Sequence, residues 1–272
     1  MVTAVITPDD QLHHHPHNNP PPTPTHQQIT VLSANLCHDW PRYRQQKERL
    51  ERLAALAERE AVDVLLLQEV SRTPKLHVDQ WLAQRLGMAA VYSRANGQAA
   101  NIGFEEGVAI LSRWPLTAPK LQILGHRRNP FVRRLALTAD MMTANGRLAL
   151  FSVHLGLLPS HNARQLNHLL HWVAALTPDR PALIGGDFNA HEQSARIRQV
   201  QQTWQDPFRQ LHPQAKGITH ELRARGKIPL SRRRLDYIFF KPHQQCWQTA
   251  VAYHLHAHHS DHQAVLLRLQ AG

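Results

Sequence analysis

Short apolar runs that stop abruptly at polar residues recur along this chain, and they constrain its fold more than any other feature. The run at 62–70 (VDVLLLQEV) and the run at 182–186 (ALIGG) are too short for buried helices. Such runs are typical of strands covered on both faces. We therefore expect strands at these two segments and at 29–36, 103–112, 133–143, 149–154, 235–240, 246–253 and 264–269.

Helical patterns are interspersed among these strands. The clearest is 163–176, where Leu166, Leu169 and Val173 recur at helical spacing, and we expect further helices at 40–60, 79–86 and 194–205. The Asn145-Gly146 pair indicates a hairpin between two strands. Because strands and helices mix without strict alternation, the sequence favours mixed sheets covered by helices, an α+β architecture, over a doubly wound parallel sheet.

The first 28 residues differ from the rest of the chain. Four prolines fall within residues 20–24, and the segment has no apolar periodicity. We expect residues 1–28 to be a disordered, His/Pro-rich tail, and residues 29–272 to form one catalytic domain. The segment lacks the pattern of a secretory signal, and no apolar run in the chain is long enough to span a bilayer. An alternative to a solvated tail is that its histidines bind a metal weakly. These histidines are His13, His14, His15 and His17.

The charge balance indicates the kind of partner. The chain has 31 Lys+Arg against 20 Asp+Glu, a net charge of +11. Such an excess favours phosphate-containing partners, such as nucleic acid or phospholipid head groups, without choosing between them. The chain has two cysteines, Cys37 and Cys246, which favours a reducing, cytoplasmic compartment, although a disulfide between them stays open.

Polar side chains stand where several of the expected strands end. Taken singly, an Asp or Asn at such a position commonly forms a turn with its own backbone. Taken together, so many oxygen and imidazole groups at separate strand ends indicate one common site. The candidates are Asn35, Glu69, His154, Asp187, Asn189, Asp236, Asp261 and His262.

These residue types suit phosphoester hydrolysis. The oxygen ligands of Glu69, Asn35 and Asp261 match Mg²⁺ or Mn²⁺, and no Cys/His spacing supports zinc. Asp187 and Asn189 lie two residues apart on an extended segment, so they can point the same way and act on one water molecule. Asp236 could select the tautomer of His262 and support its cationic form.

The ordered set of motifs resembles the endonuclease/exonuclease/phosphatase superfamily. The resemblance runs from about residue 29 to the C-terminus, and the motifs appear in the family's order: LSANL, LLLQEV, EEGVAILSRWPL, FSVHLGL, IGGDFNA, RRLDYIFF and HSDH. It implies a four-layer α/β/β/α sandwich of two mixed sheets with the active site at one edge. The HLGL and LQEV motifs are least like apurinic endonucleases and most like small bacterial-type hydrolases whose substrate is often undefined.

The resemblance also implies roles for the candidate residues. Glu69 resembles the principal metal carboxylate, Asn35 a group that contacts the metal or orients Asp187, and Asp261 a second metal ligand. Asp187 resembles the group that activates water, and Asn189 one that binds phosphate or water.

The remaining roles concern the two histidines. His262 resembles the base or the phosphate-stabilising histidine, with Asp236 orienting it. His154 resembles the histidine that stabilises the transition state or protonates the leaving group, with Glu106 as its partner, or Glu105 if the match slips by one. How the acid and base duties divide stays open.

Two arginine clusters allow different interpretations. Arg232, Arg233 and Arg234 directly precede the RRLDYIFF motif, and we interpret them as a substrate-binding rim, with a solvated loop as the alternative. For Arg127, Arg128, Arg133 and Arg134 we favour a solvated face. The chain is thus expected to be an Mg²⁺/Mn²⁺-dependent phosphoesterase acting on a nucleic acid or phospholipid-type diester. The alternative is a catalytically inactive, basic binding module of the same fold.

Overall fold

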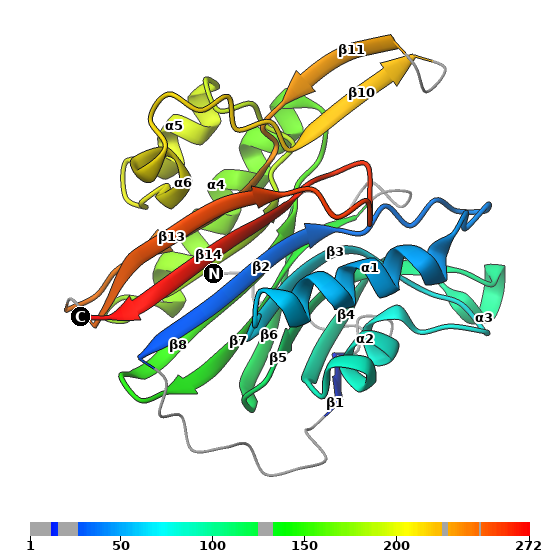
Figure 1. Ribbon diagram of the computed structural model, residues 1–272, viewed down its shortest axis with the longest axis horizontal. Coiled ribbons are helices and arrows are strands. Elements are labelled where there is room, and N and C mark those ends of the chain that lie inside the picture. Colours follow the sequence, from blue (N-terminus) through cyan, green and yellow to red (C-terminus); the bar gives the residue numbers. More distant parts are fainter. Residues whose placement is uncertain (1–11, 16–26, 125–132, 225–227, 245) are drawn as a thin grey trace.

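A computed structural model provides the coordinates, and it describes residues 12–15, 27–124, 133–224, 228–244 and 246–272. Two mixed β-sheets lie face to face, as Figure 1 shows. The first sheet has the order β1-β4-β5-β3-β2-β14-β13. Its strands are β1 (His13–His15), β2 (Gln28–Asn35), β3 (Val64–Arg72), β4 (Ala89–Gly97), β5 (Glu105–Ser112), β13 (Trp247–Leu255) and β14 (Ala264–Ala271).

The second sheet has the order β12-β9-β8-β7-β6. Its strands are β6 (Leu116–Leu124), β7 (Arg134–Thr143), β8 (Gly146–His154), β9 (Ala182–Asp187) and β12 (Asp236–Lys241). A separate ribbon of two antiparallel strands, β10 (His220–Ala224) and β11 (Ile228–Arg233), extends beyond the sheets (Figure 1).

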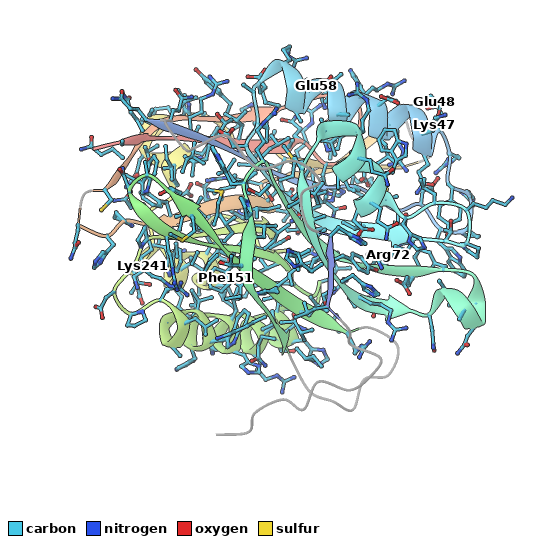
Figure 2. All side chains as sticks on the ribbon, turned by 90° about the horizontal axis from the view of Figure 1, so that it is seen from below. Lys47, Glu48, Glu58, Arg72, Phe151 and Lys241 are labelled. Carbon is cyan, nitrogen blue, oxygen red and sulfur yellow. The ribbon has the colours of Figure 1, made fainter. Side chains whose placement is uncertain are left out.

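Helices cover the outer faces of both sheets. Figure 2 shows α1, which carries Glu48 and Glu58, at one surface of the molecule and α4 at the opposite one. The helices are α1 (Gln46–Arg59), α2 (Val78–Leu86), α3 (Ala99–Ile102), α4 (Pro159–Leu176), α5 (Ala195–Gln201) and α6 (Pro207–Leu211). This arrangement confirms the expected four-layer α/β/β/α sandwich.

Strand alternation explains why the apolar runs have no polar face. In β3, Val64 and Leu66 belong to the core between the two sheets, whereas Leu65 and Leu67 belong to the core beneath α1 and α2. Successive side chains of a strand point to opposite faces, so a strand in the middle of four layers must be apolar on both. A third core, which includes Phe151, lies between the second sheet and α4.

The two glycines of the IGGDFNA motif are required by close packing. A Cβ at Gly185 would lie 2.5 Å from Leu66 Cδ1 of the facing sheet. A Cβ at Gly186 would lie 2.0 Å from the Val153 carbonyl oxygen of β8. Both distances are too short for a side chain, so β9 can approach its neighbours and deliver Asp187 only if these positions are glycine.

The N-terminal segment differs in part from the expected tail. Residues 1–11 and 16–26 lie outside the described structure, so the expectation for them is not addressed. Within the segment, however, His13–His15 pair with β4 as an edge strand, and β2 begins at Gln28. The expectation of disorder was therefore wrong for residues 13–15, because unpaired edge backbone groups can recruit a polar segment without apolar periodicity.

Other boundaries also shift. The helix expected from residue 40 begins at Gln46, because Pro41 lacks an N–H and Tyr43 and Gln45 have positive φ. The helix expected over 194–205 ends at Gln201. β4, β6, α3 and α6 were not expected from the sequence, and the β10–β11 ribbon was interpreted as a loop. The Asn145-Gly146 hairpin joins β7 and β8 as expected.

Two further features concern the helices and the cysteines. No helix in the described part of the chain is long and apolar enough to cross a membrane. Cys37 and Cys246 are free thiols, and burial, followed by the nearby Asp261 carboxylate, raises the pKa of Cys37 to about 12.

We expect His254 to make the fold sensitive to acid. Its ring stacks on Phe208 at 3.8 Å, and burial, followed by the charge of Arg234, lowers its pKa to about 3. Below its ordinary pKa of 6.5 the unfolded chain binds a proton at this histidine while the folded chain does not, so stability is lost as the pH falls. Relative to pH 7.5, His254 should cost about 1–2 kcal/mol at pH 5.

Urea unfolding at pH 7.5 and pH 5 checks this expectation. The variant His254→Phe keeps an aromatic ring on Phe208 but cannot bind a proton, so it should lose less stability between the two pH values than the natural chain. Equal losses in both proteins would show that His254 is not the source of the acid sensitivity.

Candidate active site

The polar strand ends identified in the sequence meet at one edge of the two sheets. β2, β3, β8 and β9 all end there, and β12 begins there (Figure 1). Strand register places three of the side chains in one row: His154 of β8 lies beside Asp187 of β9, which pairs with Asp236 of β12. Residues far apart in the sequence therefore form a single cluster.

Asn35 joins the carboxylates of the two facing sheets. Its Nδ2 donates to Glu69 Oε1 and to Asp187 Oδ2, both at 3.2 Å, while its Oδ1 accepts from the Cys37 backbone N–H at 2.9 Å. Glu69 reaches this position because β3 is irregular between Leu67 and Val70, where Glu69 adopts a φ of 53°. Of the two roles expected for Asn35, this geometry matches the one that orients Asp187.

Asp187 and Asn189 form a tight turn after β9. The backbone N–H of Asn189 donates to Asp187 Oδ1 at 2.8 Å, and Asn189 has a φ of 47°. The Asn189 side chain donates to the Leu155 carbonyl oxygen at 2.9 Å, and buried Asn162 donates to the Phe188 carbonyl oxygen at 2.7 Å. Thus Asp187 and Asn189 lie together, and Asn162 fixes the loop that carries them.

His262 and Asp236 form a buried pair. His262 Nδ1 lies 2.8 Å from Asp236 Oδ2, and the Thr219 hydroxyl donates to the same oxygen at 2.6 Å. Burial opposes the charged imidazole, but the Asp236 carboxylate outweighs burial and raises the pKa of His262 to about 10. With Nδ1 held by Asp236, the Nε2 atom is the ring nitrogen left for a substrate.

The neighbour of His154 is Arg134, which corrects two expectations. Arg134 Nη1 lies 3.3 Å from His154 Nδ1 and 3.9 Å from Glu106 Oε1, so the guanidinium takes the position expected for Glu106 as the partner of His154. Arg134 was also interpreted as part of a solvated face, but its side chain is 14% exposed. Buried Glu106 attracts this cation into the site, and Glu105 lies near the backbone of Ala99 instead.

This neighbour determines the state of His154. A guanidinium can only donate hydrogen bonds, so His154 Nδ1 must be an unprotonated acceptor and Nε2 must carry the proton. His154 Nε2 lies 3.7 Å from Asp187 Oδ2. Burial, followed by the charge of Arg134, holds the pKa of His154 well below its ordinary value. His154 is therefore a neutral hydrogen-bond donor.

The carboxylates at this edge repel one another. Burial, followed by the charge of Asp236, raises the pKa of Asp187 to about 7. Burial, followed by the charge of Glu69, raises the pKa of Glu106. A divalent cation would relieve this repulsion, and the carboxylate oxygens of Glu69 and Asp187 fit a hard ion such as Mg²⁺ or Mn²⁺.

Asp261 lies in a second group beside His262. Its Oδ2 is 3.8 Å from His220 Nε2, and the rings of His220 and His262 are 4.4 Å apart. Although burial opposes it, the neighbouring His220 and His262 lower the pKa of Asp261. Two triads have ligand atoms within 4.8 Å of one another: His220, Asp261 and His262, and Asp187, Asp236 and His262.

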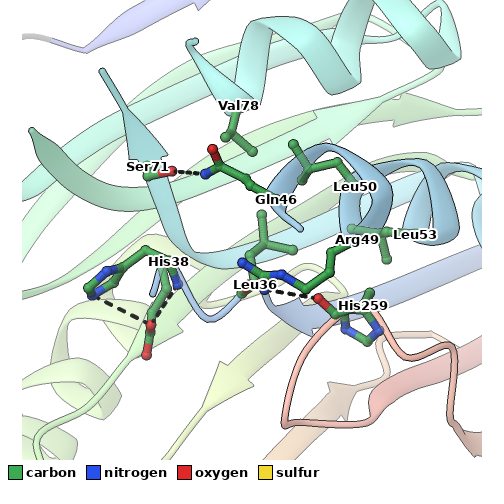
Figure 3. Close-up of a pocket in the computed structure, with 10 residues that line it drawn as sticks. Leu36, His38, Gln46, Arg49, Leu50, Leu53, Ser71, Val78 and His259 are labelled. Carbon is green, nitrogen blue, oxygen red and sulfur yellow. Dashed lines mark hydrogen bonds and ion pairs between the residues drawn. The ribbon is translucent and has the colours of Figure 1, made fainter. Parts of the chain in front are cut away.

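A small cavity lies behind Glu69, between α1 and the ends of β2 and β3 (Figure 3). Its volume is about 10 Å³, which is near the smallest space that holds one water molecule. His38 lines it, donating its backbone N–H to Glu69 Oε2 at 3.2 Å, and its Nε2 lies 3.7 Å from Glu106 Oε2. The cavity is too small for a substrate and supports the position of Glu69.

The three arginines expected to bind substrate separate in the structure. Arg234 is 1% exposed and pairs with Asp206 at 2.7 Å and with Glu192 at 3.0 Å. It is therefore a buried structural residue, and its interpretation as part of a substrate rim was wrong. Arg232 and Arg233 are exposed on β11, where Arg232 pairs with Glu221 of β10 at 3.1 Å.

Sequence reasoning missed several residues of the site. Thr219 precedes β10 and His220 begins it, in a ribbon that was interpreted as a loop, and no motif marked either residue. His38 follows the strand that carries Asn35, so a polar residue just beyond a strand end was the available signal. No sequence pattern marked Arg134 as a site residue, because the direction of its side chain depends on where β7 begins.

Comparison with known proteins identifies the family. The Endonuclease/Exonuclease/phosphatase family matches residues 32–262, and the chain belongs to this family. The uncharacterized protein YbhP of Escherichia coli strain K12 is 28% identical over 218 residues, covering 74% of this chain and 81% of YbhP.

Solved structures share the fold. An endonuclease/exonuclease/phosphatase family protein from Leptotrichia buccalis superposes with a TM-score of 0.73 at 17% identity, covering 89% of this chain and 99% of that one. The catalytic domain of human Nocturnin with a bound sulfate anion gives a TM-score of 0.72 at 17% identity, with 97% of both chains covered. Members of this family are generally hydrolases of phosphoester bonds.

Proposed function

We propose that this protein is an Mg²⁺- or Mn²⁺-dependent phosphodiesterase. The observation that carries the proposal is the Asn35 amide, which donates to Glu69 and Asp187 at 3.2 Å each. These partners lie 34 and 152 residues away from Asn35 in the sequence. The Asn35 amide thus holds Glu69, which could bind a cation, beside Asp187, which could activate a water molecule. Bound sulfate in the Nocturnin structure, an analogue of phosphate in charge and shape, agrees with a phosphoester substrate.

Each side chain of the cluster has a role in this proposal. Glu69 would hold the cation, which when bound neutralises charge on the phosphoryl oxygens. Asn35 positions Glu69 through its amide N–H, whereas Asp261 lies in the separate group with His220 and His262. Asp187 accepts the proton of the attacking water, and Asn189 fixes the direction of that water or of a phosphoryl oxygen. The short link between Asp187 Oδ1 and the Asn189 N–H keeps the second oxygen of Asp187 directed into the site.

The two histidines divide the remaining work. His262, supported as a cation by Asp236, donates from Nε2 to the phosphoryl or leaving oxygen. His154 donates from Nε2 as a neutral group and stabilises charge as it develops. Asp187 is then the base, because neither histidine offers an unprotonated nitrogen to the attacking water in this arrangement.

An inactive binding module of the same fold accounts for fewer of these observations. The cluster of carboxylates around Asp187 would repel a polyanion unless a cation were present. The free thiols of Cys37 and Cys246 agree with a reducing compartment, and we propose a cytoplasmic protein.

We expect the purified chain to hydrolyse bis(p-nitrophenyl) phosphate, an activated soluble diester, with Mg²⁺ or Mn²⁺. Removal of the cation with EDTA should abolish the reaction, because the carboxylates would then repel the anionic substrate. Excess Mn²⁺ added after EDTA should restore the rate, which is followed by the absorbance of p-nitrophenolate. An undiminished rate in EDTA would contradict metal dependence, and no rate with either cation would favour the inactive module.

A further inference from the structure

Exposed apolar side chains gather at the edge that carries the active site. Within the described part of the chain, nine large apolar side chains are exposed, and six of them lie on segments next to the strand ends at this edge. The six include the most exposed of the nine, Leu157 at 72%. We call them the apolar rim: Trp40, Ile102, Leu157, Leu158, Leu222 and Leu230.

Strand topology explains why these residues share one end of the molecule. Trp40 follows the end of β2, and Ile102 lies in α3, between the end of β4 and the start of β5 (Figure 1). Leu157 and Leu158 follow the end of β8, directly after His154. These strand ends lie at the same edge as the row of His154, Asp187 and Asp236, so the rim includes residues from both sheets.

The β10–β11 ribbon contributes the other two members. Leu222 and Leu230 are 51% and 63% exposed, and the ribbon stands away from both sheets (Figure 1). A two-stranded ribbon has no core of its own, so it offers these exposed leucines no packing partner. The ribbon leads directly into Asp236, which ties its position to the catalytic edge.

Exposed basic residues lie on the same segments. Arg42 follows Trp40 in the loop after β2, and Arg233 ends the ribbon beside Arg232. The chain as a whole has a net charge of +11. The edge therefore combines apolar and basic side chains, which is the combination that associates with an anionic membrane surface.

The apolar rim distinguishes a lipid surface from a nucleic acid. Five of its six side chains are aliphatic and lack the π face on which bases stack; only Trp40, which lies 5.5 Å from Phe104 in a stacked arrangement, has one. Aliphatic groups gain free energy when they leave water for hydrocarbon. A bilayer also presents phosphodiesters at its surface, within reach of a site that opens at the same edge.

We propose that the apolar rim docks this protein on an anionic bilayer and that the active site takes phospholipid diesters from it. The substrate class rests on the proposed function, whereas docking does not require catalysis. Leucine side chains enter the interface while the arginines contact lipid phosphates. The phosphodiester of a lipid head group then lies level with Asp187 and His262.

Flotation with vesicles, in EDTA so that no lipid is hydrolysed, tests docking. The full chain should bind vesicles of phosphatidylcholine with 30 mol% phosphatidylglycerol more strongly than vesicles of phosphatidylcholine alone. The paired substitutions Leu222→Gln/Leu230→Gln and Leu157→Gln/Leu158→Gln should each lower the partition coefficient at least about tenfold, since two leucines no longer leave water. Met142→Gln, an exposed apolar residue at the opposite end of β7, is the matched control and should bind like the natural chain.

The outcomes separate docking from catalysis. Hydrolysis of bis(p-nitrophenyl) phosphate shows that each variant is folded, and two independent leucine pairs keep the test valid if one pair fails to fold. Vesicle binding that is equal in both pairs and in Met142→Gln would overturn the apolar rim as a docking surface. No vesicle binding together with salt-sensitive binding to single-stranded DNA or RNA would overturn it in favour of nucleic acid. Vesicle binding without diester hydrolysis would overturn the substrate class and the proposed function, but leave docking intact.

Discussion

Asp187→Asn should lower kcat for a phosphodiester by about 10²- to 10⁴-fold, the scale of lost general-base help. An asparagine can still accept the hydrogen bond from the Asn189 backbone N–H, which is 2.8 Å from Asp187 Oδ1. It cannot accept a proton from water, and its amide would oppose the Asn35 amide that now donates to Oδ2 at 3.2 Å. The substitution therefore removes the base while it keeps most of the shape of the site.

Asp140→Asn is the matched control for this substitution. Asp140 is a buried carboxylate of the same sheet, but it pairs with Arg180 at 2.6 Å and lies beside Ala149, away from the catalytic edge. Its neutralisation should cost stability and leave kcat nearly unchanged. Melting temperatures and the dependence of the rate on substrate concentration give both quantities. If Asp187→Asn kept the natural kcat, another group would have to be the base.

The convergence of the site could be predicted from sequence because it depends on strand ends. Asn35, Glu69, His154 and Asp187 each close an apolar run, and the edge at which parallel strands end is the same for all of them. The need for two glycines before Asp187 depends on the distance between the two sheets, and this distance cannot be calculated from one segment of the sequence. In the structure, a Cβ added at Gly185 would lie 2.5 Å from Leu66 Cδ1 of the facing sheet.

The partners of the site residues were harder to predict than the residues themselves. Arg134 replaces Glu106 as the neighbour of His154, because both lie near the edge and register decides which one reaches the ring. Arg234 looked like its exposed neighbours in the arginine run, but it lies between β11 and β12, where its guanidinium pairs with buried Asp206. An exposed and a buried arginine are indistinguishable in sequence unless the buried acidic partner is known.

The second large effect concerns the charge on Asp236. Asp236 Oδ2 accepts from Thr219 at 2.6 Å and lies 2.8 Å from His262 Nδ1, whereas its Oδ1 is buried without a hydrogen-bond partner. An asparagine can place its carbonyl oxygen where Oδ2 lies and its amide nitrogen where Oδ1 lies. Asp236→Asn therefore keeps both hydrogen bonds and removes the negative charge alone.

Without that charge, burial is opposed by the carboxylates of Asp187 and Asp261, and the pKa of His262 falls from about 10. A lower pKa leaves less of His262 charged at pH 7, so His262 is a poorer proton donor. We expect kcat at pH 7 to fall by about 10²- to 10⁴-fold. The pH of the highest rate should move downward in the variant, because the Asp236 charge raises the pKa of both Asp187 and His262 and both pKa values fall when it is removed.

Rates from pH 5 to pH 9 and an NMR titration of the His262 ring measure these two effects separately. Asp206→Asn is the matched control, because it neutralises a buried carboxylate that holds Arg234 at 2.7 Å outside the catalytic row. It should lower the melting temperature but keep the natural pH profile. A displaced His262 titration with an unchanged kcat would show that His262 transfers no proton in the rate-limiting step. The leaving oxygen would then have to depart without a proton from His262, because His154 is a neutral hydrogen-bond donor.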